Sequence, residues 1–161
     1  MQIVLLSVSG IPRPQPRPIV TRGRAISIAN PKTKAWADQI LRAAHAAKQE
    51  ATPTGALAVE LLFRMPTKDA KRWGKPHLSV PDADNLAKLA LDAMQKGGLF
   101  PNDSAVWSLS ASKVWERPEH AGMTAGVQWG EAVKPPPPLS SPEHPRWIDQ
   151  AGQGAGDGVQ G

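Results

Sequence analysis

The sequence has 161 residues and a formal net charge of +5 at pH 7, which is enough for one domain with its own hydrophobic core. It contains no cysteine, which excludes disulfide bonds and thiolate–zinc sites, and no pair of its four histidines has the H-x-x-x-H spacing of a histidine-built metal site. The first 130 residues hold 17 Lys and Arg against 10 Asp and Glu, whereas residues 131–161 hold 2 against 4. This distribution favours a polyanionic partner, with nucleic acid the first candidate, although modest basicity alone is also common among soluble proteins.

The N-terminal segment, 2–8, is rich in Val, Ile and Leu and predicts a β-strand. It is too short to span a membrane and lacks the charged start and small-residue cleavage pattern of a signal peptide. We therefore expect no membrane association and a cytoplasmic location.

Residues 10–18 cannot form regular structure, because four prolines remove backbone donors and fix φ. Short apolar runs at 19–21 and 25–28 flank an Arg-Gly-Arg turn and predict a small hairpin. Guanidinium groups match the geometry of phosphates, so this part of the chain predicts DNA contacts, with a solvated charged loop as the alternative. The expected contacts are Arg13, Arg17, Arg22 and Arg24.

Asn30 can cap a helix over 31–50, with Pro31 at the favoured first position. Trp36 lies on the apolar face of this helix, which favours a core role over stacking on a base. Residues 56–65 alternate between apolar and other side chains and are the clearest strand in the chain.

The next segment, 66–79, has no periodicity and predicts a long basic loop. We interpret it as a mobile arm that contacts DNA, with a flexible surface loop as the alternative. Trp73 has no apolar partner at helical or strand spacing, so it could stack on an unpaired base or be incidental. The expected DNA contacts of the arm are Lys68, Lys71, Arg72 and Lys75.

The stretch 80–103 carries the densest chemistry. Asp82 and Asp84 precede a helical pattern, with Asp84 the expected N-cap and Gly97-Gly98 the expected stop. Lys88 follows one turn into the helix, and a short turn then leads to Asp103. We expect the acidic groups from both ends of this helix to converge. Three carboxylates beside an amine would suit a Mg²⁺-dependent site that cleaves phosphodiester bonds, with Lys88 stabilising developing negative charge.

The motif alone does not decide between two explanations. A D-x-D pair is weak and has a high false-positive risk. A helix cap, a neighbouring turn aspartate and an i,i+4 ion pair between Asp84 and Lys88 would account for the same residues. Both explanations stay open on the residues by themselves.

Two further strands are predicted at 105–116 and 122–129, and we expect them to form an antiparallel pair. Residues 131–161 are rich in Pro and Gly and lack the apolar content to offset chain entropy, so we expect a disordered tail. Within it, 145–148 could be a docking motif or a stray apolar pair.

The run PDADNLAKLALDAMQKGGLFPND, continued by SAV, resembles the RusA family of Holliday-junction resolvases. The start of the chain is also similar, with a first strand, Gly-Ile-Pro, Arg-Pro repeats and then a Trp-bearing helix. The resemblance covers roughly residues 1–130, and only its central motif is specific. It implies a mixed α+β fold, in which a small mixed sheet of about four strands packs with two main helices.

The resemblance further implies a homodimeric, Mg²⁺-dependent endonuclease of phage or prophage type, acting in a bacterial host cell on four-way DNA junctions during recombination and repair. Carried over by position, Asp82, Asp84 and Asp103 would be catalytic metal ligands and Lys88 the catalytic lysine. Asn102 stands where the family usually has a first Asp, and we expect activity to survive this departure. The alternatives are a non-catalytic DNA-binding protein that kept the fold and a less selective nuclease for branched DNA.

Overall fold

The computed structural model describes residues 1–26 and 30–130. The expected disordered tail, 131–161, and the 145–148 motif within it lie outside the described residues, as do residues 27–29.

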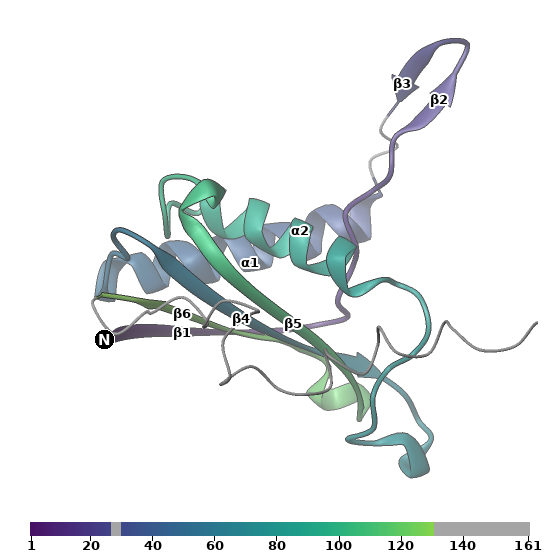
Figure 1. Ribbon diagram of the computed structural model, residues 1–161. Helices are drawn as coiled ribbons and strands as arrows, with labels where there is room; N and C mark the ends of the chain where they lie inside the picture. Colours follow the sequence, from purple (N-terminus) through teal and green to yellow (C-terminus); the bar gives the residue numbers. More distant parts are fainter. Residues whose placement is uncertain (27–29, 131–161) are drawn as a thin grey trace, which may run out of the picture.

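A four-stranded mixed sheet and two helices form the body of the protein (Figure 1). Both helices cover the same face of the sheet, and no helix of residues 1–26 or 30–130 covers the opposite face (Figure 1). The mixed α+β fold implied by the resemblance is therefore confirmed. The strands, in their order across the sheet, are β1 (Gln2–Ser9), β6 (Gly122–Trp129), β4 (Leu57–Pro66) and β5 (Val106–Glu116), and the helices are α1 (Pro31–Glu50) and α2 (Ala83–Lys96).

The expected pairing of the last two strands is wrong, because β4 lies between β5 and β6. Leu61 of β4 aligns with Ala111 in the parallel β5 and with Ala125 in the antiparallel β6. The chain passes from β5 to β6 through a short 3-10 turn, η3 (Pro118–His120), beside the end of β4. The most regularly alternating strand thus takes a central place, where both of its edges are hydrogen-bonded.

The core lies between the sheet and the two helices. The alternation of β4 is confirmed, since all of its predicted inward residues are buried, as is Trp36, which is 3% exposed. The helices approach closely at Gly97, where an added Cβ would lie 2.6 Å from the carbonyl oxygen of Leu41. Fully burying an aliphatic or aromatic side chain contributes roughly 1.5–3 kcal/mol. The buried residues of β4 and α2 in this core are Leu57, Val59, Leu61, Phe63 and Met65 from β4 and Leu86, Ala87, Leu89, Ala90, Ala93 and Met94 from α2.

The two helices begin differently. Asn30 caps α1, and its side chain accepts a hydrogen bond from the Lys32 amide at 2.9 Å, as predicted. Helix α2 begins at Ala83, so Asp82 and not the expected Asp84 occupies the capping position. At its C-terminal end, Gly98 has the left-handed φ of +78° that favours glycine.

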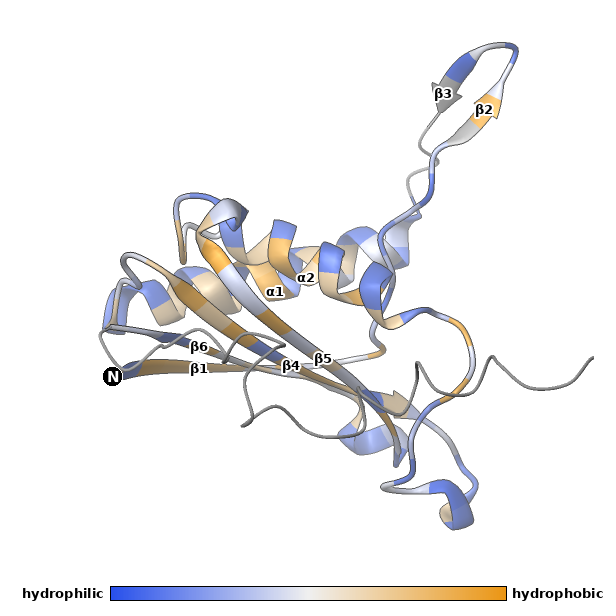
Figure 2. Ribbon diagram, viewed as in Figure 1, coloured by the Kyte–Doolittle hydropathy of each residue, from blue (hydrophilic) through white to orange (hydrophobic). Residues whose placement is uncertain are grey.

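Two segments project from the body at the end of the molecule where both helices begin (Figure 1). The first is the predicted hairpin of β2 (Ile19–Thr21) and β3 (Arg24–Ile26), which turns at Arg22 and Gly23. Its second strand begins one residue before the predicted run. The second is the loop between β4 and α2, with a short 3-10 turn, η1 (Ala70–Arg72). Figure 2 shows hydrophilic residues at both of these tips.

No helix among the described residues is both long enough and apolar enough to cross a lipid bilayer.

Candidate functional site

The N-terminal end of α2 presents two carboxylates to solvent. Asp82 immediately precedes the helix and Asp84 is its second residue, and both are exposed. The first turn of a helix carries unsatisfied N–H groups and a partial positive charge, which stabilise nearby anions. The start of α2 therefore places Asp82 and Asp84 next to each other, and its partial positive charge stabilises their negative charges without cancelling them.

Neither carboxylate has the structural role that the sequence left open. Asp82 occupies the capping position, yet its side chain accepts no capping hydrogen bond. In the part of the chain that the structure describes, no ion pair joins Asp84 to Lys88. Helix capping and an i,i+4 ion pair therefore do not explain why acidic residues stand here.

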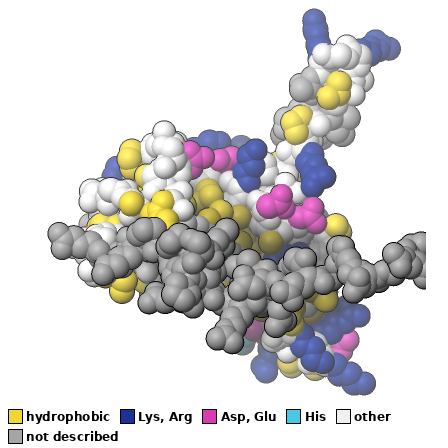
Figure 3. All heavy atoms as spheres, viewed as in Figure 1, with side chains coloured by type: hydrophobic (Ala, Val, Ile, Leu, Met, Phe, Trp, Pro, Cys, Tyr) yellow, Lys and Arg dark blue, Asp and Glu magenta, His cyan; other side chains and the backbone are white. Residues whose placement is uncertain are grey.

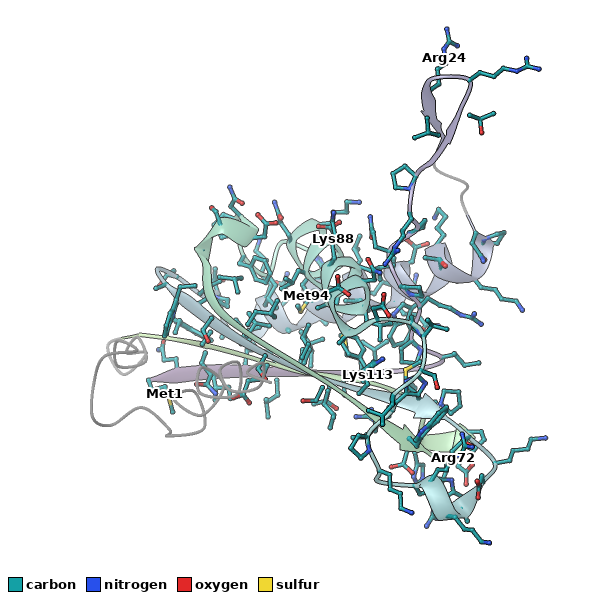
Figure 4. The ribbon with its side chains drawn as sticks, turned by 45° about the vertical axis from the view of Figure 1, so that its right-hand side comes forward. Met1, Arg24, Arg72, Lys88, Met94 and Lys113 are labelled. Carbon is teal, nitrogen blue, oxygen red and sulfur yellow. The ribbon has the colours of Figure 1, made fainter. Side chains whose placement is uncertain are left out.

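Lys88 lies one turn further along α2 and is exposed. Residues four apart on a helix lie on the same side, so Lys88 follows Asp84 along one face. Figure 4 shows Lys88 on the side of α2 that faces away from the sheet. An amine thus lies near the carboxylates without being paired with them.

Asp103 lies at the other end of α2, in the 3-10 turn η2 (Asp103–Ala105). Helix α2 has 14 residues. At about 1.5 Å per residue, it separates Asp103 from the carboxylates at its start by roughly 20 Å. The expectation that the acidic groups converge within one chain is therefore wrong. Across residues 1–26 and 30–130, no three acidic or histidine side chains gather closely enough to hold a metal ion.

Asp103 lies far from Asp82 and Asp84 because of the direction that the chain takes after α2. The turn at Gly97 and Gly98 leads into β5, which begins beside the start of β4 and not beside the start of α2. Asn102 caps the intervening turn, because its side chain accepts a hydrogen bond from the Ser104 amide at 3.0 Å. The residue that departs from the family pattern thus has a local structural role.

The proline-rich segment packs against the N-terminal end of α2. Arg17 donates a hydrogen bond from Nη2 to Oδ2 of Asp82 at 3.2 Å, and the Gln15 amide donates to the carbonyl oxygen of Asn85 at 3.0 Å. A groove of about 710 Å³ runs between this segment, the start of α1 and the start of α2, and Arg13, Arg17 and Asp82 line it. Two of the predicted phosphate-binding arginines therefore line the same groove as Asp82, and one of them contacts it.

Lys113, which the sequence analysis missed, fixes the loop that leads into Asp82. Its ammonium donates hydrogen bonds to the carbonyl oxygens of Ser79 at 2.8 Å and Pro81 at 2.7 Å. A signal was present in the sequence, since Lys113 stands in phase with Leu109 and Ala111 in a strand. A lysine at such a position must find acceptors when it is partly buried.

The basic loop is attached to β5 and does not match the mobile arm that we expected. The Gly74 amide donates to the carbonyl oxygen of Trp115, the Trp115 amide donates to that of Lys75, and the His77 amide donates to that of Lys113. The loop thus extends the sheet edge, although its four predicted DNA contacts, Lys68, Lys71, Arg72 and Lys75, remain exposed.

Trp73 packs against protein groups. Its Nε1 donates to the carbonyl oxygen of Thr67 at 3.0 Å, and the guanidinium of Arg117 lies 4.5 Å from its ring centroid. One ring face is therefore already covered, which favours a structural role over base stacking.

His77 is 4% exposed, and its ring centroid lies 4.0 Å from that of Trp115. Burial lowers the pKa of His77 below its ordinary value, and the nearby positive charge of Lys113 acts in the same direction. Its Nδ1 has no hydrogen-bond partner among the described residues. Both effects disfavour the charged form of the His77 imidazole.

The carboxylates lie between the two projecting basic segments. Figure 4 shows Arg24 at the tip of the hairpin and Arg72 on the basic loop, with Lys88 and Lys113 between them. Figure 3 shows Lys and Arg side chains on both projections and acidic side chains along α2 and at its end. The basic side chains of the two projections can thus bind the phosphates of a nucleic acid. The carboxylates of Asp82 and Asp84 lie between these two basic segments and can offer oxygen ligands to a metal ion.

Comparison with known families identifies one match. The sequence model of the family described as Endodeoxyribonuclease RusA matches residues 9–122, which is most of the chain and includes Asp82, Asp84, Lys88 and Asp103. No curated protein matches the sequence significantly.

Proposed function

Because the chain belongs to the RusA endodeoxyribonuclease family, we propose that it is a Mg²⁺-dependent endonuclease that resolves four-way DNA junctions by paired symmetric cuts during recombination and repair. The observation that carries this proposal is the exposed pair Asp82 and Asp84, which lies between two basic segments and has neither of the structural roles weighed for it.

The donor set at the start of α2 fits Mg²⁺ in part. Magnesium prefers oxygen ligands and is usually held by one or two carboxylates together with water and substrate phosphate. Asp82 and Asp84 would supply the carboxylates. When bound, the ion would activate a water nucleophile and neutralise charge on the scissile phosphate. Lys88 would place its ammonium against the negative charge that develops during cleavage.

Asp103 would join this site only from a second copy of the chain. A two-fold axis perpendicular to α2 would bring the start of α2 in one protomer beside the end of α2 in its partner. Two equivalent sites would result, each with Asp82 and Asp84 from one protomer and Asp103 from the other. The proposed homodimer would therefore complete the ligand set that a single chain leaves divided.

The face that carries α2 and β5 has the character of such an interface. The edge strand β5 exposes Trp107 and Leu109, which are 37% and 47% accessible. Apolar groups at the centre of a patch with charged groups at its margin are typical of subunit contacts. A dimer formed there would also cover the part of the β5 edge before Lys113, which the basic loop leaves unpaired among the described residues.

The arginines would position the DNA backbone on both sides of the cut. Arg13 and Arg17 line the groove at the start of the helices, and Arg22 and Arg24 lie on the projecting hairpin. The basic loop would hold a second arm of the junction through Lys68, Lys71, Arg72 and Lys75. Contacts of this kind fix the register of the DNA without reading its sequence.

The test is cleavage of a synthetic four-way junction with Mg²⁺, using Asp82→Asn and the matched control Glu60→Gln. Asp82→Asn should reduce cleavage by at least about a hundredfold, because it removes a charged metal ligand. Junction binding should persist or strengthen, because negative charge near the phosphates falls. Glu60→Gln removes an exposed carboxylate from the middle of β4, away from both ends of α2, and should cleave like the wild type.

Three other results would count against the proposal. Normal cleavage by Asp82→Asn would refute the site assignment. Junction binding by the wild type without cleavage would favour a non-catalytic DNA-binding protein. Equal cleavage of junctions, flaps and forks would favour a less selective nuclease for branched DNA.

A further inference from the structure

Lys113 reaches from β5 to the loop that ends at Asp82. Its ammonium bonds two carbonyl oxygens, those of Ser79 and Pro81, and Pro81 directly precedes Asp82. We propose that Lys113 is a positioning residue for the pair Asp82 and Asp84, because it fixes the backbone from which Asp82 projects. This inference rests on the proposed function of the two carboxylates as metal ligands.

Little else holds this part of the loop. Leu78 and Val80 are 90% and 80% exposed, so their side chains provide almost no packing. Within the described residues, no other hydrogen bond reaches the backbone of 78–81. The flanking bonds are those from the His77 amide to Lys113 and from the Leu86 amide to Asp82. Without the Lys113 ammonium, the intervening backbone would be attached only at its two ends.

Lys113 is itself held firmly. It aligns with the fully buried Phe63 in the parallel ladder of β4 and β5, so its backbone belongs to the sheet. Its side chain is partly buried and carries three N–H donors, which suits two convergent carbonyls. The rigid sheet is thereby connected to the exposed carboxylate pair.

The expected consequence concerns metal binding more than DNA binding. Groups that orient metal ligands typically change metal affinity or activity by about 10–100-fold when they are removed. Both bonded acceptors are main-chain carbonyls, so the ammonium acts on the protein backbone. Lys113 thus differs from Lys88, which we propose acts on the phosphate.

The experiment compares Lys113→Met, Lys113→Arg and the control Lys34→Met, which removes one surface charge from α1. Three quantities are measured: the Mg²⁺ concentration for half-maximal junction cleavage, junction affinity without Mg²⁺, and amide hydrogen exchange over 78–86. Lys113→Gln, which keeps a polar end on the side chain, replaces Lys113→Met if that variant does not fold.

Lys113→Met should raise the Mg²⁺ midpoint about tenfold or more, leave junction affinity within about twofold, and speed exchange at the Leu86 amide. Lys113→Arg should recover most of the midpoint, because a guanidinium can also donate to two carbonyls. Lys34→Met should match the wild type in all three measurements.

An unchanged Mg²⁺ midpoint in a folded Lys113→Met variant would overturn the inference. Parallel losses of junction affinity and cleavage would also overturn it, because Lys113 would then be a DNA contact. Failure of the proposed function is distinguishable, since the wild type itself would not cleave. In that case the hydrogen-exchange comparison still decides whether Lys113 fixes the loop.

Discussion

At the scale of single residues, Asp82 and Asp84 have different neighbours although one residue separates them. Arg17 lies against Asp82, with side chains 74% and 54% exposed, whereas no ion pair to Asp84 occurs in the described chain. Exposed ion pairs contribute little to stability, typically about 0–1 kcal/mol. Arg17 can therefore exchange Asp82 for a DNA phosphate at small cost, which would leave the carboxylate oxygen for a metal ion.

The burial of His77 leads to a prediction about how the stability of the fold depends on pH. Burial lowers the pKa of His77 below its ordinary value of 6.5, so the unfolded chain binds a proton more readily than the folded one. The contribution of His77 to stability should be complete above pH 6.5 and should be lost as the pH falls from 6.5 towards the folded pKa. The urea midpoint of the wild type should therefore fall more between pH 7.5 and 5.5 than that of His77→Phe, which keeps an aromatic ring against Trp115.

The control for this prediction is His45→Gln, which replaces an exposed histidine of α1 and should keep the wild-type pH response. Identical pH responses of the wild type and His77→Phe would show that His77 does not carry the effect.

At the scale of elements, the hairpin of β2 and β3 is the clearest candidate for a DNA arm. It projects from the body, and its turn exposes Arg22 and Arg24 (Figures 1 and 4). The side chain of Val20 is 72% exposed, so it adds nothing to the core. The exposed arginines at the tip are therefore better placed to bind a polyanion than to stabilise the body of their own chain.

Replacing both arginines, as Arg22→Gln/Arg24→Gln, should weaken binding to junction and duplex DNA alike. Each lost phosphate contact reduces the slope of log affinity against log salt by about 0.9, so the slope should fall by about 2. Folding should be unaffected, because both side chains are exposed. The measurement is a titration of junction DNA at several salt concentrations.

A matched control, Lys34→Gln/Arg42→Gln, removes the same charge from α1. If it lowers the slope equally, net charge and not the hairpin would be responsible for the effect.

Local elements could be predicted from the sequence, whereas their pairing could not. Residues close together in the sequence determine the alternation of β4, the Asn30 cap of α1 and the Gly-Gly end of α2. Successive strands usually lie side by side, so β5 and β6 were expected to pair. The insertion of β4 between them depends on contacts between residues far apart in the sequence, which periodicity does not report.

The same limit applied to the site. The sequence marked Asp82, Asp84 and Asp103 but could not give the direction of the chain after Gly98, which sends Asp103 to the far end of α2. The Lys113 bonds were missed for a similar reason, since Ser79 and Pro81 are 34 and 32 residues away in the sequence.

At the scale of the whole molecule, the two helices run in the same direction. Both begin at the end that carries the hairpin and the basic loop, and the groove with Arg13 and Arg17 lies there (Figure 1). Helix N-termini and basic side chains thus favour anions at the same end. Asp103 lies at the opposite end of α2, so a single chain offers the acidic groups at two separate places.

A divided site can be tested by complementation between two inactive variants. Asp82→Asn and Asp103→Asn should each abolish junction cleavage as homodimers. If each site takes Asp82 and Asp84 from one protomer and Asp103 from the other, a heterodimer of the two variants contains one complete site and one doubly altered site. It should therefore cut one strand of the junction. The measurement uses the two variants co-expressed with different tags and purified through both.

A heterodimer of Asp82→Asn with Asp84→Asn is the matched control for this experiment. Because both carboxylates of a site come from the same protomer, neither of its sites is complete, and it should remain inactive. If each site were instead built within one chain, the heterodimer of Asp82→Asn with Asp103→Asn would be inactive too, since every chain would carry a defective site. Strand cutting by that heterodimer but not by the control would therefore separate a shared site from a self-contained one, using variants whose homodimers are all inactive.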